Sequence, residues 1–397
     1  MNRIIKRWLI ALLHGLFLFV ASWVWLSSSA SYGNEALLIK WASVIKRTVL
    51  KIDEDPPAKD FLFINVAHEK ELITSEEYLG KEVITDRAQL AAFFNIIKAG
   101  NNPHKFILCD VFLKGDSPND SVFAASVENL KNVVFPVHFV DNDSVDKPKF
   151  DLSYAIADYK TTGDAFLKFN LVQKKNLPSV PVFMYDKLDG GSIRTGKFVN
   201  TDEGRLIFNN PVIDFPVRSY EVFQENEYPV VNLSELLVLP QEAVINDYLK
   251  NRIILIADFD NDTHSTIYGK TPGTLILLNT YLMLKSKYHI VSACWVFLMI
   301  ICYTIISYFL FFYQAKPHPE NLRRSTSFFT SFLNYLVTLG FISVVSYILF
   351  HVYINILIFA VYLNCFSYLI GLKNKTRQLP KINVLFMTVK KAYFNFK

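Results

Sequence analysis

Four long apolar stretches dominate the pattern of this 397-residue chain. Each contains about twenty residues without Lys, Arg, Asp or Glu, the length that an α-helix needs to cross ~30 Å of hydrocarbon. A buried helix of a globular domain rarely sustains such a run. We therefore predict four transmembrane helices, at Leu9–Leu26, Ile290–Tyr313, Phe328–Phe350 and Tyr353–Leu372.

The first stretch has a second interpretation, as a cleaved secretory signal peptide. Small residues at positions 27–31 resemble a peptidase site. The apolar run is nevertheless longer than the usual signal core of about 7–15 residues. Trp23 and Trp25 also lie where aromatic residues gather at a membrane interface. We favour an uncleaved anchor.

The distribution of Lys and Arg predicts the orientation. The N-terminus, the loop at 314–327 and the tail after Leu372 together carry thirteen basic residues and one acid, whereas the rest of the chain carries 28 basic and 35 acidic residues. Since cytoplasmic segments are enriched in Lys and Arg, both termini are predicted to be cytoplasmic. The acidic middle part then lies outside a bacterial inner membrane. The overall charge of +5 sums two opposite regions and does not indicate a nucleic-acid partner.

These boundaries predict four segments. They are a cytoplasmic start with the first transmembrane helix at 1–29, an extracytoplasmic domain at 30–289, three transmembrane helices at 290–372 and a basic cytoplasmic tail at 373–397.

The extracytoplasmic segment alternates short apolar runs with helical periodicity. Such alternation predicts an α/β domain with a mostly parallel sheet. The expected strands are 61–66, 106–112, 133–140 and 253–258, and the expected helices are 85–98, 120–131, 240–249 and 274–284. The less regular section at 141–239 predicts β-rich insertions. Directly after the anchor, 34–51 reads as an amphipathic helix whose apolar face contains Leu37, Leu38, Trp41, Ile45 and Val49.

Local patterns in this segment resemble the type-2 CHASE domain, an extracellular sensory domain of bacterial signalling proteins. A strand that ends in an acid, Ile107-Leu108-Cys109-Asp110, precedes an acid-led helix and a Val-rich strand at 132–135. Asp86-Arg87 opens a helix, as in that family, and 250–256 resembles its final strand. The loop that follows, with Asp262-Thr263-His264 and Thr271-Pro272-Gly273, is also similar. The resemblance implies a sensory domain followed by three closely spaced transmembrane helices.

Three departures from that family change the expectation. The first strand carries Ile64-Asn65-Val66-Ala67-His68 where acids are common, and Leu277-Leu278 replaces the usual His-Ala pair. A different ligand, or none, would follow. Only about 25 residues remain after Leu372, where relatives carry a kinase, cyclase or phosphatase domain. We therefore expect signalling through a separate effector protein, cytoplasmic or in the membrane.

The sharpest polar cluster follows the last predicted strand. Asp258, Asp260 and Asp262 alternate there, with His264 next. Carboxylates at this spacing can hold a divalent cation such as Ca²⁺, although the turn glycine and closing Glu of a calcium loop are missing. A solvated or capping loop is the simpler interpretation, and no other cofactor is predicted.

A ligand crevice is the alternative use of these acids. Asp110 also ends a strand, so it would lie near Asp258 and Asp262 at one edge of the sheet. Asp86 and Arg87 would complete a site for a small polar ligand, together with His264. An ion pair between Arg87 and one of the acids explains the same residues without a ligand.

The sequence predicts a sensor rather than an enzyme. It contains no nucleophile elbow, Gly-rich phosphate loop or zinc-ligand spacing. The predicted ligand is a small molecule, an ion or an envelope component. An envelope scaffold that binds another protein, and an extracytoplasmic metal-dependent enzyme, are the alternatives. Sensors of this kind often form homodimers, but no sequence feature demonstrates one here.

Overall fold

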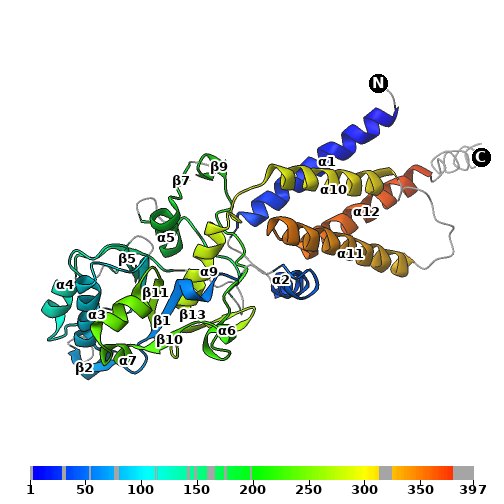
Figure 1. The fold of residues 1–397 in the computed structure, drawn as a ribbon. Coiled ribbons are helices and arrows are strands. Elements are labelled where there is room, and N and C mark those ends of the chain that lie inside the picture. The colour runs from blue at the N-terminus through cyan, green and yellow to red at the C-terminus, as the bar shows by residue number, and fades with distance from the viewer. Residues whose placement is uncertain are drawn as a thin grey trace, which may run out of the picture. The chain divides into compact units, whose positions relative to one another are not determined.

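The computed structural model describes most of the chain, namely residues 3–28, 33–52, 55–75, 80–111, 113, 115–140, 144–146, 150–158, 166–173, 177–196, 199–312 and 324–378. It divides into two compact units (Figure 1). One unit comprises Met1–Trp25 with Ser292–Lys397, and the other comprises Leu26–Val291. The predicted tail beyond residue 378 lies outside the described residues.

The unit Leu26–Val291 is built on a parallel sheet of six strands in the order β10-β1-β11-β4-β5-β6. Its strands are β10 (Val230–Asn232), β1 (Phe61–Asn65), β11 (Ile253–Ala257), β4 (Phe106–Asp110), β5 (Val133–Val137) and β6 (Tyr154–Ile156). Every residue of β11 is buried, as expected for a central strand covered on both faces. The predicted α/β class and parallel sheet are confirmed. The short strands β6 and β10 were not predicted.

Helices cover both faces of the sheet (Figure 1). On one face lie α3 (Arg87–Ala99), α4 (Asp120–Val127), α7 (Leu233–Leu237) and a π-helical segment. This segment, Val244–Leu249, directly follows the short helix α8 (Gln241–Ala243). On the other lie α5 (Val180–Asp189), α6 (Ser219–Phe223) and α9 (Gly273–Lys285). Helix α9 is buried from Gly273 to Leu284. Such a helix is apolar all round, which explains its weak amphipathic pattern.

Three small antiparallel sheets complete this unit. They are β2 (Lys70–Ser75) with β3 (Gly80–Thr85), β12 (Thr263–Thr266) with β13 (Gly269–Pro272), and β7 (Ile193–Thr195) with β8 (Asn200–Asp202) and β9 (Arg205–Leu206). The last of these falls within the section predicted to be β-rich.

Helix α2 (Gly33–Val44) and the π-helical turn Ile45–Val49 follow the first apolar helix. The sequence identifies the apolar face of this segment, but it does not show whether that face is buried in the protein or exposed. Leu37, Trp41 and Val49 are all more than half exposed. The side packed against the α/β unit instead contains Ser43 and Lys46, which are almost fully buried.

The other unit contains α1 (Arg3–Leu26), α10 (Ala293–Phe312), α11 (Arg324–Phe350) and α12 (Ile356–Gln378). Among the described residues, three helices are long and apolar enough to span a membrane: α1, α10 and Phe328–Phe350 of α11. The apolar part of α12, Ile356–Ile370, is shorter. After α11, the turn begins at His351, which has a positive φ of 57°.

Polar side chains connect these apolar helices. His14 of α1 contacts Ser307 of α10 at 2.7 Å and Tyr362 of α12 at 3.1 Å. Trp295 of α10 donates to Ser346 of α11 at 2.9 Å. In an apolar environment such contacts contribute roughly 1 kcal/mol each.

Gly15 allows α1 and α10 to approach closely, and its replacement by Val should therefore destabilise the helical unit. A Cβ atom at Gly15 would lie 2.9 Å from the backbone nitrogen of Thr304, so the helices would have to separate. We expect a loss of about 1–3 kcal/mol, typical of overpacking, measured as a lower Tm of the detergent-solubilised chain. Leu13→Val is the control, because Leu13 is 60% exposed on the same helix. An unchanged Tm for Gly15→Val would contradict this packing.

Candidate functional site

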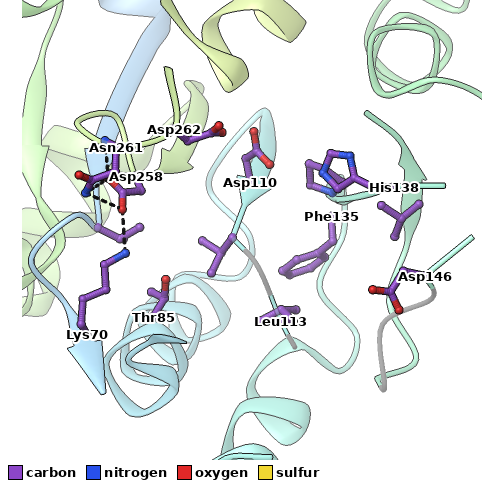
Figure 2. A pocket seen from close by; sticks show the side chains of 14 residues that line it. Lys70, Thr85, Asp110, Leu113, Phe135, His138, Asp146, Asp258, Asn261 and Asp262 are labelled. Atoms are coloured by element: carbon purple, nitrogen blue, oxygen red, sulfur yellow. Dashed lines mark hydrogen bonds and ion pairs between the residues drawn. The ribbon is translucent and has the colours of Figure 1, made fainter. Parts of the chain in front are cut away.

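A cleft of about 480 Å³ opens at the carboxyl edge of the parallel sheet (Figure 2). Strands β1, β11, β4 and β5 all end there because their pairing is parallel. Strand β11 leads to α9 on one face of the sheet, whereas its neighbours β1 and β4 lead to α3 and α4 on the other face. Ligands of open α/β sheets bind at such a switch point. The lining residues are Val66, Lys70, Thr85, Asp110, Val111, Leu113, Phe135, Pro136, Val137, His138, Asp146, Asp258, Asn261 and Asp262.

Asp110 lies at the centre of this cleft. Figure 2 shows its carboxylate between Asp262 on one side and His138 on the other. Thr274, in the first turn of α9, donates a hydrogen bond to Asp110 Oδ2 at 2.7 Å. Burial, together with the negative charge of Asp262, raises the pKa of Asp110 to about 6 against the hydrogen bond from Thr274. A carboxylate held at this cost is a common feature of functional sites.

Asp258 lies on the side of the cleft away from His138, and its carboxylate has hydrogen-bond and ion-pair partners (Figure 2). Lys70 Nζ contacts Asp258 Oδ2 at 2.8 Å, and Asn261 donates to the same carboxylate from its backbone and side chain. Burial would raise the pKa of Asp258, but these hydrogen bonds outweigh it and lower the pKa below its ordinary value. Asp258 therefore stays ionised and its charge is balanced by Lys70.

His138 follows β5 and faces Asp110 across the cleft. Its Nδ1 lies 3.0 Å from Asp158 Oδ1, and this hydrogen bond raises the pKa of His138 despite partial burial. Among the residues that the structure describes, four carboxylates line the cleft, from Asp110, Asp146, Asp258 and Asp262, against Lys70 and His138. This described lining is net negative at neutral pH. Such a site favours a ligand that carries a positive charge.

The structure brings together some of the predicted ligand residues and separates others. Asp110, Asp258 and Asp262 line one cleft, and His264 contacts Asp262 at 3.1 Å. Asp86 is instead the N-cap of α3, accepting hydrogen bonds from the backbone of Ala88 and Gln89.

Arg87 also lies away from the cleft lining. Its guanidinium is buried, forms an ion pair with Asp120 and donates to Gly115 O at 3.1 Å. This arrangement is an ion pair of the kind considered above, with Asp120 as the acid rather than a carboxylate of the cleft. Arg87 holds α3 against α4 and the loop that precedes it.

The three carboxylates of the predicted cation loop do not converge. Asp260 is not among the residues that line the cleft, and it accepts a hydrogen bond from Asn65 Nδ2 at 3.1 Å. Within the part of the chain that the structure describes, no group of three or more His, Cys, Asp or Glu side chains is placed to hold a metal ion. The geometry gives no support to a divalent cation at Asp258, Asp260 and Asp262.

Sequence reasoning missed several residues of the cleft. Lys70 lies on the β2–β3 hairpin, which interrupts the strand–helix alternation and was not predicted. His138 was placed inside a strand, although β5 ends at Val137. The signal was the same as for Asp110, a polar residue immediately after an apolar strand, so His138 was recognisable on that basis.

A second polar cluster surrounds the buried carboxylate of Asp202. Asp202 is fully buried and accepts hydrogen bonds from Tyr185 Oη at 2.8 Å and from His289 Nε2 at 3.0 Å. Lys287 lies 3.5 Å from the same carboxylate. These contacts join β8 to the segment that follows α9. Because the Asp202 carboxylate is satisfied by Tyr185, His289 and Lys287, we assign the cluster a structural role.

We expect the Asp202 cluster to contribute less to the free energy of unfolding below neutral pH. Burial lowers the pKa of His289 to about 4, and its Nδ1 has no hydrogen-bond partner among the described residues, so a second ring proton would be unsatisfied. As the pH falls below 6.5, His289 becomes protonated in the unfolded chain but stays neutral in the folded chain. The contribution of His289 to stability is therefore present above pH 6.5 and is lost as the pH falls toward 4. Between pH 7 and 5.5 we expect a loss of about 1 kcal/mol.

The measurement is thermal unfolding of the full chain and of His289→Gln at both pH values. The variant keeps a side-chain donor for Asp202 but cannot titrate, so its Tm should fall less than that of the wild type. Equal pH dependence in the two proteins would contradict a neutral, buried His289.

Comparison with known proteins found no relative: no protein-family model, no curated protein and no solved structure matches the chain.

Proposed function

We propose that this chain is a membrane-anchored extracytoplasmic sensor whose α/β unit binds a small cationic ligand in the acidic cleft. The single observation that carries the proposal is the position of Asp110. Its carboxylate lies in a preformed cleft at the switch point of the sheet, beside Asp262, with its pKa raised to about 6 by burial. A ligand amine would relieve that cost by pairing with the carboxylate.

The anchoring half of the proposal rests on the apolar helices and the charge distribution. Four crossings, by α1, α10, α11 and the shorter α12, would leave both termini in the cytoplasm of a bacterial cell. The α/β unit would then face the periplasm or the outside. The resemblance of the sequence to type-2 CHASE sensors is the reason that the proposal includes a separate effector protein, which would receive the signal.

Helix α9 offers a physical route from the cleft toward the membrane. Its first turn donates to Asp110 through Thr274, and its last residue, Lys285, precedes α10 by only seven residues of chain. Part of that connection is fixed on β9, because Val291 N donates to Leu206 O at 2.9 Å. A ligand that changes the Asp110–Thr274 contact would bias the position of α9. The shift is limited to the ligand's difference in affinity between the two states.

A thermal-shift panel on the full chain in lipid nanodiscs tests the ligand class. Small amines, such as polyamines and cationic amino acids, should raise the Tm of the wild type in proportion to the logarithm of their concentration. Dicarboxylates should not. Asp262→Asn should reduce the shift because one carboxylate of the cleft is lost.

The matched control is Asp260→Asn, in the same loop but outside the cleft lining. It should respond to amines as the wild type does. A response to dicarboxylates alone, or amine shifts that persist in Asp262→Asn combined with Asp110→Asn, would contradict a cationic ligand in this cleft.

A further inference from the structure

Helix α2 and the π-helical turn after it bury two polar side chains while they expose an apolar stripe. The inner side contains Ile39, Ala42 and Ser43 of α2 and Lys46 of the turn, all at most 2% exposed. The outer side contains Leu37 and Trp41, each 59% exposed, and Val44, 38% exposed. The outer residues recur at steps of four and three, so they form one stripe along the helix.

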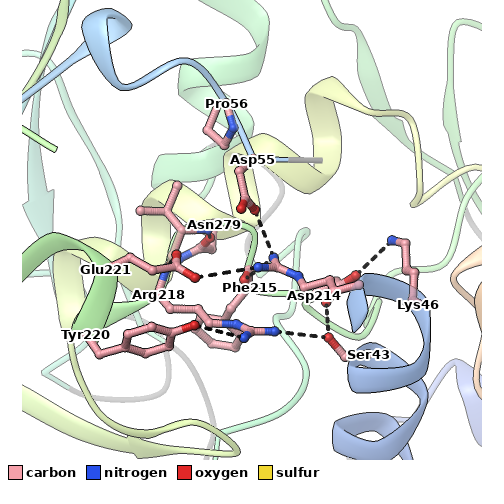
Figure 3. Close-up of polar contacts among 12 residues, drawn as sticks. Ser43, Lys46, Asp55, Pro56, Asp214, Phe215, Arg218, Tyr220, Glu221 and Asn279 are labelled. Carbon is pink, nitrogen blue, oxygen red and sulfur yellow. Dashed lines mark hydrogen bonds and ion pairs between the residues drawn. The ribbon is translucent and has the colours of Figure 1, made fainter. Parts of the chain in front are cut away.

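Ion pairs and hydrogen bonds fix the inner side to the α/β unit (Figure 3). Lys46 Nζ contacts Asp214 Oδ2 at 3.1 Å, and Ser43 donates to the same carboxylate at 3.3 Å. Arg47 reaches Asp55 at 3.1 Å and Glu221 at 3.6 Å. With these contacts in place, the helix cannot rotate to bury its apolar stripe without breaking the buried pair.

This arrangement is unfavourable in water. Fully burying a Leu side chain is worth about 1.5–3 kcal/mol, and Trp has a larger surface still. In water, a helix orientation that buried Leu37 and Trp41 against the protein would have the lower free energy. The outer stripe is therefore adapted to an apolar or interfacial neighbour.

The short connection between α1 and α2 indicates that the apolar neighbour is a lipid surface. Only six residues separate Leu26, the end of α1, from Gly33, the start of α2. The seven steps from Leu26 to Gly33, at 3.3–3.6 Å each, span roughly 23–25 Å at most, so α2 begins within that reach of the end of α1. Lys40 is exposed within α2, adjacent in sequence to Trp41, as expected for contact with anionic headgroups. Trp41 has the amphipathic ring that favours the headgroup level.

We propose that α2 lies on the lipid surface, with Leu37, Trp41 and Val44 inserted at the level of the headgroups. The helix then fixes the α/β unit to the bilayer at a second place beyond α1. This inference rests on the proposed insertion of α1 in a membrane, and it adds the lipid surface as a binding partner of the α/β unit.

Site-specific fluorescence tests the proposal on the full chain in liposomes of phosphatidylcholine and phosphatidylglycerol. The background carries Ala at Cys294, Cys302 and Cys365. Cys109 stays, because it is fully buried and burial raises the pKa of its thiol. An environment-sensitive dye is attached at Trp41→Cys or Val44→Cys. Lipids with a shallow spin label and aqueous iodide are then used as quenchers.

Two further positions serve as controls. Val122→Cys, on α4, is similarly exposed at 53% and should be quenched by iodide alone. Leu13→Cys, in α1 and 60% exposed, should be protected from iodide and quenched by a deep spin label. This second control reports the insertion of α1 separately, so the inference and the proposed anchoring can fail independently.

We expect dye at position 41 or 44 to be quenched by the shallow lipid label at least twofold more than dye at position 122, and to be protected from iodide. Quenching by iodide at the level of position 122 would place the stripe in water and overturn the proposal. Protection from both quenchers would also overturn it, since protein, such as a second copy of the chain, would then cover the stripe.

Discussion

Replacing Lys46 by Met is expected to lower the free energy of unfolding of the α/β unit by about 3–5 kcal/mol, the usual cost of leaving one member of a buried ion pair alone. Lys46 is 2% exposed and Asp214 is 8% exposed. After the substitution, the Asp214 carboxylate keeps only hydrogen bonding and loses its counter-charge. The measurement is the Tm or chemical denaturation of the full chain in detergent.

A double variant separates the ion pair from general packing. Lys46→Met with Asp214→Leu removes both charges and should recover most of the lost stability, since apolar replacements of buried pairs are often neutral. Lys59→Met is the matched control: Lys59 is exposed, so its loss should change stability by less than about 0.5 kcal/mol. If the double variant were as unstable as Lys46→Met alone, the ion pair would not be what fixes α2 to the α/β unit.

Asp110→Asn is expected to stabilise the ligand-free protein while weakening ligand binding at least tenfold. Burial raises the pKa of Asp110 from 3.8 to about 6, so at pH 7 the folded chain carries a charge that folding disfavours. The neutral amide removes that cost and its repulsion with Asp262, and still accepts a hydrogen bond from Thr274. We expect a gain of about 2 kcal/mol at pH 7.

The gain should disappear in acid. As the pH falls through 6 toward 3.8, the folded wild type takes up a proton before the unfolded chain does, so the wild type gains stability relative to Asp110→Asn. Thermal unfolding of both proteins at pH 7 and pH 5 measures the difference, and an amine titration measures binding. An Asp110→Asn protein that is less stable at pH 7 and binds amines normally would remove Asp110 from the site.

The sequence was sufficient for four strands of the central sheet, β1, β4, β5 and β11, and for part of the cleft. Apolar strand runs separated by helical periodicity leave little choice but a parallel sheet, and its polar strand ends must meet at one edge. Asp110, Asp258 and Asp262 follow from that rule alone. Lys70 could not be placed in this way, since the β2–β3 hairpin brings it to the cleft from a different element.

Other residues were misplaced because long-range pairing overrides local pattern. Asp86 and Arg87 open a helix, but whether a buried Arg faces a ligand or an acid depends on where Asp120 is brought by the fold. Helix α2 illustrates the same limit. Its apolar stripe is evident in the sequence, yet its inner side is chosen by Asp214 and Glu221, more than 160 positions along the chain.

The location of the α/β unit outside the cytoplasm is the claim on which the ligand and the direction of signalling depend. Labelling of intact cells with a membrane-impermeant maleimide tests it most directly, in the chain carrying Ala at Cys294, Cys302 and Cys365. Cysteine at Val122 reports the α/β unit, and cysteine at Thr376 reports the basic C-terminal segment. We predict that Val122→Cys is labelled in intact cells and that Thr376→Cys is labelled only after the membrane is opened. Labelling of Thr376→Cys with protection of Val122→Cys would contradict the account.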